Sequence, residues 1–84
     1  MNISAPNIIA RARDVLVSND ELIVLLVDGR KIGAPLEWFP KLLKATKEQR
    51  SKFELLGDGE GIHWPDIDED LSVEGLLRGT RVPS

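Results

Sequence analysis

The sequence predicts an α+β fold: a three-stranded antiparallel β-meander, then short helices with one or two further short strands, and a short C-terminal helix. Runs rich in β-branched residues, separated by turn residues, fill the first half of the chain. The Asp28-Gly29 pair between two such runs is typical of a hairpin. After Pro35 the apolar spacing changes from alternation to the helical period.

The 84 residues are enough for one small domain. We expect this domain to span residues 10–79, after a loosely ordered lead-in at residues 1–9 and before a tail at residues 80–84. The chain has no cysteine, so disulfides and thiolate metal sites are excluded. The longest apolar run has six residues and no signal-peptide pattern opens the chain, so we expect a cytoplasmic protein with no membrane contact.

Three strands are expected in the first half of the chain. Regular alternation in the first, residues 10–17, would place Ala12, Asp14 and Leu16 on one face and Arg13, Val15 and Val17 on the other. The continuous apolar run at residues 22–27 predicts a strand covered on both faces, or nearly so. Asp28-Gly29 predicts a two-residue type I′ turn with positive φ at both positions. The third strand should stop at Pro35, which cannot donate to a ladder.

The second half reads as short helices and strands. A turn at residues 35–39 leads to a helix that begins at about Pro40, and Thr46 with Gln49 forms a capping box for a second helix at residues 47–53. The segments "FELL" and "GIHW" are candidate strands. Ser72 should cap the last helix, and Gly79 should end it in the left-handed conformation.

Charge is distributed unevenly along the chain. Residues 41–52 carry five bases and one acid, a sum of +4, whereas residues 57–74 carry seven acids and no Lys or Arg, a sum of −7. The basic stretch could contact phosphates, but it lacks interleaved aromatic residues and the whole chain has a net charge of −3. Direct nucleic-acid binding is therefore not our leading interpretation.

The stretch "GDGEGIHWPDIDED", residues 57–70, has the residue types of a metal or catalytic loop. Its D-x-D-x-D pattern starts like an EF-hand calcium loop, but Leu71 and Leu77 occupy the positions where that loop needs Gly and Glu. With one histidine and no cysteine, we expect no metal and no cofactor.

An enzyme is not expected either. Glu60, His63 and Asp66 are acid–base types, but the stretch contains no nucleophile elbow, dinucleotide fingerprint or P-loop. A structural interpretation accounts for every residue type: glycine turns redirect the chain, Ile62 and Trp64 face the core, and the carboxylates form a surface. Such a surface can imitate a nucleic-acid backbone and occupy the basic groove of a partner.

Several motifs in this chain resemble one bacterial family. They are Asp28-Gly29-Arg30, Pro35-Leu36, Trp38-Phe39-Pro40, Ala45-Thr46, Gln49-Arg50 and the whole run from Gly59 to Leu77. Together they are similar to the pattern of the family known as domain of unknown function 2442, over about residues 10–79. Phe53 stands where that family more often has Trp, a conservative difference.

The resemblance implies a small cytoplasmic α+β domain with no established catalytic or binding residues. Stand-alone members often lie beside a gene for a second small protein, in a layout like that of toxin–antitoxin pairs. We therefore expect a non-enzymatic, antitoxin-like module that binds a small basic protein encoded nearby. The alternatives are a nucleic-acid-associated regulatory module and a phage-borne inhibitor of a host defence protein that mimics nucleic acid.

The expected partner-binding residues lie in the acidic stretch and include its two aromatic or imidazole side chains. They are Asp58, Glu60, His63, Trp64, Asp66, Asp68, Glu69 and Asp70. An exposed edge strand of the meander could also pair with a second copy of the chain, so a homodimer is a further expectation.

Overall fold

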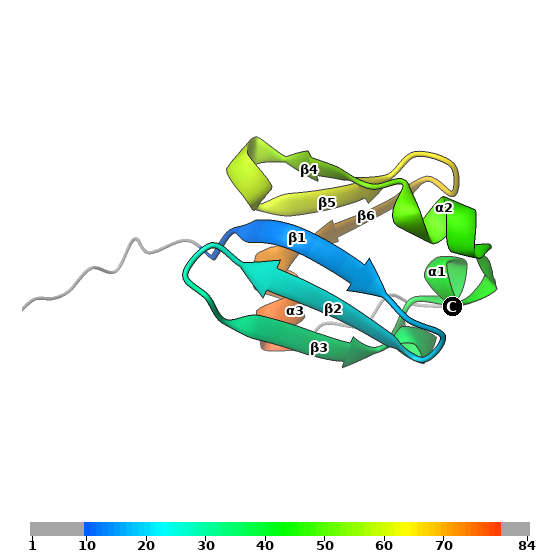
Figure 1. Ribbon diagram of the computed structural model, residues 1–84, viewed down its shortest axis with the longest axis horizontal. Coiled ribbons are helices and arrows are strands. Elements are labelled where there is room, and N and C mark those ends of the chain that lie inside the picture. The colour runs from blue at the N-terminus through cyan, green and yellow to red at the C-terminus, as the bar shows by residue number, and fades with distance from the viewer. Residues whose placement is uncertain (1–9, 80–84) are drawn as a thin grey trace, which may run out of the picture.

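The computed structural model describes residues 10–79, and its two antiparallel sheets lie in two layers (Figure 1). The first sheet has the order β1-β2-β3, formed by β1 (Ala12–Val17), β2 (Glu21–Leu26) and β3 (Lys31–Pro35). The second has the order β4-β5-β6, formed by β4 (Glu54–Leu56), β5 (Gly61–Trp64) and β6 (Glu69–Ser72). The lead-in at residues 1–9 and the tail at residues 80–84 lie outside the described residues.

Short helices connect and follow the sheets. The 3-10 turn η1 (Leu36–Trp38), α1 (Pro40–Lys44) and α2 (Lys47–Ser51) lead from the first sheet to the second. The turn η2 (Gly57–Gly59) joins β4 to β5, and α3 (Val73–Arg78) follows β6. This order confirms the predicted α+β class. No helix within residues 10–79 is long and apolar enough to cross a membrane.

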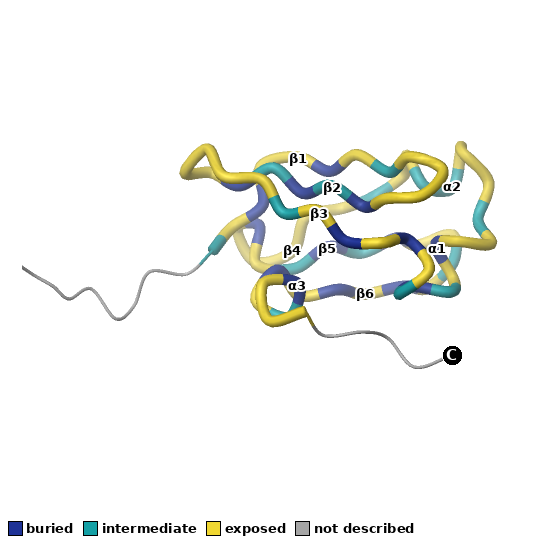
Figure 2. The backbone as a smooth tube through the Cα atoms, turned by 90° about the horizontal axis from the view of Figure 1, so that it is seen from below, coloured by how far each residue is buried: buried dark blue, intermediate teal, exposed yellow. Residues whose placement is uncertain are grey.

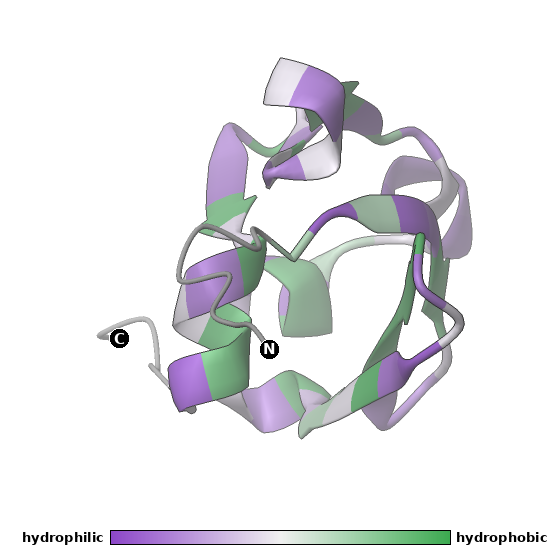
Figure 3. Cartoon of the chain, turned by 90° about the vertical axis from the view of Figure 1, so that its left-hand side faces the viewer, coloured by the Kyte–Doolittle hydropathy of each residue, from purple (hydrophilic) through white to green (hydrophobic). Residues whose placement is uncertain are grey.

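The core lies between the two layers, where the buried positions of both sheets are found (Figure 2). Its largest fully buried side chains include Trp64 and Ile62 from β5, Leu22 and Leu26 from β2, and Phe39 before α1. The helix α3 contributes the buried side chains of Val73 and Leu76 to the core. Hydrophobic and hydrophilic residues alternate around its turns (Figure 3). Burial of these apolar groups is the main source of stability in a domain without disulfides.

Regular alternation along β1 was a wrong prediction. Ala12 and Val15 are both buried, whereas Leu16 is 53% exposed. The register shifts between Ala12 and Asp14, where one extra residue forms a β-bulge. A bulge inserts an unpaired residue and moves the following side chains to the opposite face. Ala12 and Val15 therefore share the core face although they are three residues apart.

The β2–β3 connection also differs from the prediction. Gly29 has a φ of 96°, but Asp28 is not among the residues with positive φ. The N–H of Gly29 donates to the carbonyl of Leu26, and the N–H of Leu26 donates to the carbonyl of Arg30. The loop is thus a three-residue turn that ends in a left-handed glycine, not a two-residue type I′ turn. The side chain of Asp28 accepts the N–H of Arg30 and thereby stabilises the turn.

β2 is fully covered on one face only. Leu22, Val24 and Leu26 are buried, whereas Ile23 and Leu25 on the other face are partly exposed. The predicted strands at "FELL" and "GIHW" are confirmed as β4 and β5, and the caps at Thr46, Ser72 and Gly79 are confirmed as well. The second helix ends at Ser51, two residues earlier than predicted. The strand β6 was not predicted.

Candidate binding face

The structure divides the acidic stretch into parts with different surroundings. β5 and β6 pair antiparallel, with His63 opposite Asp70 and Trp64 opposite Glu69. Because side chains alternate across a strand, these two pairs point to opposite faces of the second sheet. The pair His63–Asp70 lies on the outer face, and the pair Trp64–Glu69 lies on the core face.

A row of three polar side chains crosses the outer face of the second sheet. β4 places Glu54 opposite His63, and β6 places Asp70 on its other side. The Nδ1 of His63 donates to Oδ1 of Asp70 at 2.5 Å, which fixes the ring against the sheet. Glu54 and Asp70 are exposed. Glu54 was not among the predicted partner-binding residues, although the pairing of "FELL" with "GIHW" could have placed it there.

Two predicted partner-binding residues are buried and cannot reach a partner in this structure. Trp64 is fully buried, and its Nε1 donates to the carbonyl of Arg50 at 3.0 Å. Glu69 is only 5% exposed, and its Oε1 accepts the N–H of Asp70. Both side chains therefore have structural roles. Trp64 packs in the core and binds the backbone of Arg50, and Glu69 binds the backbone of β6.

Glu69 is an acid in an unfavourable position. Its Oε2 is buried and has no hydrogen-bond partner among the described residues. Burial raises the pKa of this carboxyl, an effect that the N–H of Asp70 and the charge of Lys41 partly offset. Burial and the missing hydrogen bond both destabilise the charged form of this carboxyl group.

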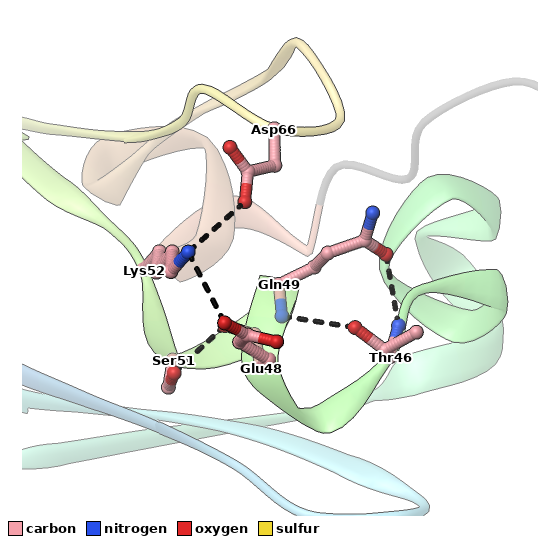
Figure 4. Close-up of polar contacts among 6 residues, drawn as sticks. All are labelled: Thr46, Glu48, Gln49, Ser51, Lys52 and Asp66. Atoms are coloured by element: carbon pink, nitrogen blue, oxygen red, sulfur yellow. Dashed lines mark hydrogen bonds and ion pairs between the residues drawn. The ribbon is translucent and has the colours of Figure 1, made fainter.

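The turn between β5 and β6 is held by the basic stretch of the same chain (Figure 4). Lys52 Nζ lies 3.9 Å from Asp66 and 3.3 Å from Glu48. Lys41 Nζ donates to the carbonyl of Asp68, which has a φ of 53°. Exposed ion pairs of this kind contribute about 0–1 kcal/mol, so they position the turn loosely and reduce its net negative charge.

Arg50 has a structural role that the sequence did not reveal. Its Nε and Nη2 donate at 2.9 Å to the carbonyls of Leu42 and Leu43 at the end of α1. The carbonyl of Leu42 also accepts the N–H of Ala45, and the guanidinium adds side-chain donors to carbonyls that a following helical turn would otherwise bind. Thr46 and Gln49 form the capping box that starts α2 and sets the position of Arg50 (Figure 4). The guanidinium is therefore occupied and does not add to a phosphate-binding surface.

The other end of the acidic stretch lies at η2. Gly57, Asp58 and Gly59 all have positive φ, which turns the chain from β4 into β5 within three residues. Asp58 and Glu60 are exposed there. The four residues of β5 separate this end from the β5–β6 turn by about 13 Å.

We name one set of groups the carboxylate face: the partly exposed His63 and the exposed acids Glu54, Asp58, Glu60, Asp66, Asp68 and Asp70. No three His, Cys, Asp or Glu side chains within residues 10–79 converge on a possible metal position. The groups are instead spread over one sheet face and the two turns at its ends. A surface with this arrangement is suited to contact a broad, positively charged partner rather than a single ion.

Comparison with known proteins yields relatives of unknown function. A crystal structure of a protein of unknown function from Rhodospirillum rubrum is similar with a TM-score of 0.75 and 31% identity, covering 89% of this chain and 93% of that chain. A solution NMR structure of an uncharacterised protein from Chromobacterium violaceum has a TM-score of 0.73 and 25% identity, covering 88% of this chain and 70% of that chain. No curated protein matches the chain.

The sequence model of one family matches residues 12–82, which include every strand and helix described above. That family is described as proteins of unknown function, DUF2442. The resemblance of the motifs between Asp28 and Leu77 is thereby confirmed. The chain belongs to the DUF2442 family.

Proposed function

We propose that this protein is a non-enzymatic binding module, antitoxin-like in role, that uses the carboxylate face to occlude a small basic protein. The observation that carries the proposal is the row of Glu54, His63 and Asp70, in which both acids are exposed, continued by carboxylates at both ends of β5. Electrostatic complementarity of this kind raises association rates and selects basic partners.

The structure narrows the set of residues that could act in this way. Trp64 and Glu69 leave the proposed contact surface because they are buried. Asp66 contributes less negative charge to the contact surface than its carboxylate suggests, because Lys52 lies beside it. Glu54 joins the surface through its place in the row. The face that remains is polar, and Leu56, which is 44% exposed, lies on the same side of β4 as Glu54.

The alternative of a nucleic-acid-binding module is weakened by the same contacts. Of the five bases in residues 41–52, Arg50 is bound to backbone carbonyls, and Lys41 and Lys52 contact the β5–β6 turn. Lys44 and Lys47 remain exposed in neighbouring helices. Two lysines would give only a shallow dependence of nucleic-acid affinity on salt concentration.

The test is a co-expression pull-down with the product of the adjacent gene. We expect the triple variant Glu54→Gln, Asp68→Asn, Asp70→Asn to retain less partner than the wild type, and the loss to be larger at low salt. The matched control removes three exposed acids of the first half of the chain: Asp20→Asn, Glu21→Gln, Glu37→Gln. Equal retention by the two triple variants would exclude the carboxylate face as the contact surface.

A further inference from the structure

The strand β1 is an outer strand of the first sheet, so no strand within residues 10–79 pairs with its second edge. The turn η2 covers the start of β1, where Gly59 approaches the backbone of Ala12. The N–H of Ser18 donates to the carbonyl of Glu21, so Ser18 belongs to a hydrogen-bonded pair with β2. Hydrogen-bonded and non-hydrogen-bonded pairs alternate along an antiparallel ladder. The backbone groups of Leu16 therefore point toward β2, and those of Val15 and Val17 point toward the open edge.

Most of these edge-facing groups make no hydrogen bond within residues 10–79. The N–H of Val15 donates to Oδ1 of Asp14 at 2.8 Å. The carbonyl of Val15 and both backbone groups of Val17 have no such contact among the described residues. A row of unpaired backbone groups is a template for another strand.

The other outer strands offer less to a second strand. β3 ends in a proline, Pro35, and β4 has only three residues. On β6, the N–H of Asp70 is occupied by the buried Glu69. β1, with six residues, is the longest of the four outer strands.

A groove of about 470 Å³ runs beside the end of β1. Val15, Val17 and Ser18 of the strand line it together with Phe53, Ser51 and two cations, Lys47 and Arg50. Next to the groove, Leu16 projects from the outer face of the sheet with 53% of its surface exposed. An apolar side chain, a set of free backbone groups and a cation thus occur at one edge.

We propose that β1 pairs antiparallel with β1 of a second copy, with Leu16 on the two-fold axis, to form a continuous six-stranded sheet. In this register Val15 of one copy lies opposite Val17 of the other, and their edge-facing N–H and C=O groups satisfy one another. Leu16 packs against Leu16 of the second copy, as the self-complementary interface of a two-fold dimer requires.

Charge favours this register over its neighbours. Asp14 comes to lie opposite Ser18 of the second copy, at the groove that Ser18 lines together with Lys47. When pairing takes up the N–H of Val15, the Asp14 carboxylate is released toward that lysine. A register centred on Val17 would instead place Asp14 opposite Asp20, and like charges directly opposite are destabilising. A register centred on Val15 would place Leu16 opposite Asp14 and leave its apolar side chain without an apolar partner.

The absence of cysteine from the chain makes the register testable by cross-linking. Leu16 and its symmetry mate form a non-hydrogen-bonded pair, with Cα atoms about 4.5 Å apart, within the range that a disulfide spans. We expect Leu16→Cys to form an intermolecular disulfide at least about tenfold faster than Leu77→Cys, the matched control on α3 with 46% exposure.

Sedimentation equilibrium of the full chain measures the assembly itself. We expect the wild type to have twice the monomer mass at high micromolar concentration, and Leu16→Lys to raise the dissociation constant at least about tenfold while Leu77→Lys leaves it unchanged. Far-ultraviolet circular dichroism of each variant verifies that it is folded. A monomeric wild type would overturn the proposal, and so would a dimer in which Leu16→Cys cross-links no faster than Leu77→Cys.

Discussion

The two sheets reach similar three-stranded topologies by different means. The first sheet has strands of five or six residues, and β2 buries three apolar side chains along one face. The second has strands of three or four residues, and its turns contain four left-handed residues: Gly57, Asp58, Gly59 and Asp68. The first sheet is thus stabilised along its length, whereas the second depends on its turns and on a few buried side chains.

This difference separates structural from exposed residues within one acidic stretch. On the core face of the second sheet, Trp64 and Glu69 face the first sheet. On its outer face, Glu54 and Asp70 are exposed on either side of the partly exposed His63. A short sheet can present a polar outer face because its stability comes from the opposite face, and the following predictions test that division.

The largest effect is expected at Trp64. Trp64→Ala removes a fully buried indole and leaves the carbonyl of Arg50 without its donor, so we expect the free energy of unfolding to fall by about 3–5 kcal/mol. Urea denaturation measures the change. Trp64→Phe keeps most of the ring and loses the N–H, and its cost should be clearly smaller. If both variants lose the same amount, ring packing does not stabilise the second sheet as described.

Contact between the two sheets at η2 gives the next largest effect. A Cβ on Gly59, whose φ is 95°, would overlap the carbonyl oxygen of Ala12 in β1. Gly57 has a φ of 53° and nothing within 4 Å of the added carbon. Left-handed backbone alone costs an alanine about 1–2 kcal/mol, so Gly57→Ala should show only that loss and Gly59→Ala more. If thermal unfolding shows equal losses of stability for the two variants, η2 does not pack closely against β1.

The smallest effect concerns the buried acid. Because the pKa of Glu69 is raised above its ordinary value of 4.5, the carboxyl favours folding below that value, and this contribution is lost as pH rises through the folded-state pKa. We expect Glu69→Gln to be more stable than the wild type at neutral pH, with a difference that shrinks as pH falls toward 4.5. A Glu69→Gln difference that is independent of pH would contradict the account.

Asp28 provides the opposite sign, since the N–H of Arg30 lowers its pKa. The stability advantage of the wild type over Asp28→Asn should therefore disappear as pH falls.

Much of the fold was predictable because local signals agree with it. The capping box at Thr46, the caps at Ser72 and Gly79, and the alternation of Ile62 and Trp64 each act within a few residues. The bulge before Asp14 and the pairing of β6 are tertiary features. In β6 only Leu71 is apolar among its four residues, so its pattern resembles a loop.

The candidate site was only partly predictable, because local sequence does not show which side chains the fold buries. The sequence shows where acids are concentrated, but not which face of a strand each occupies. Glu69 looked equivalent to Asp68 and Asp70, although its position opposite Trp64 buries it. Arg50 looked like one of five surface bases, although the carbonyls that it binds come from α1, seven and eight residues earlier. Such pairings require the fold.

The most direct test of the proposed binding face maps the partner onto the protein by NMR. Uniformly ¹⁵N-labelled protein would be titrated with the product of the adjacent gene, and amide shift changes would be recorded for each residue. We predict the largest changes at Glu54, His63 and Asp70 and in the turns at both ends of β5, with β2 and β3 unaffected. Changes centred on the first sheet, with the outer face of the second sheet unchanged, would contradict the central claim.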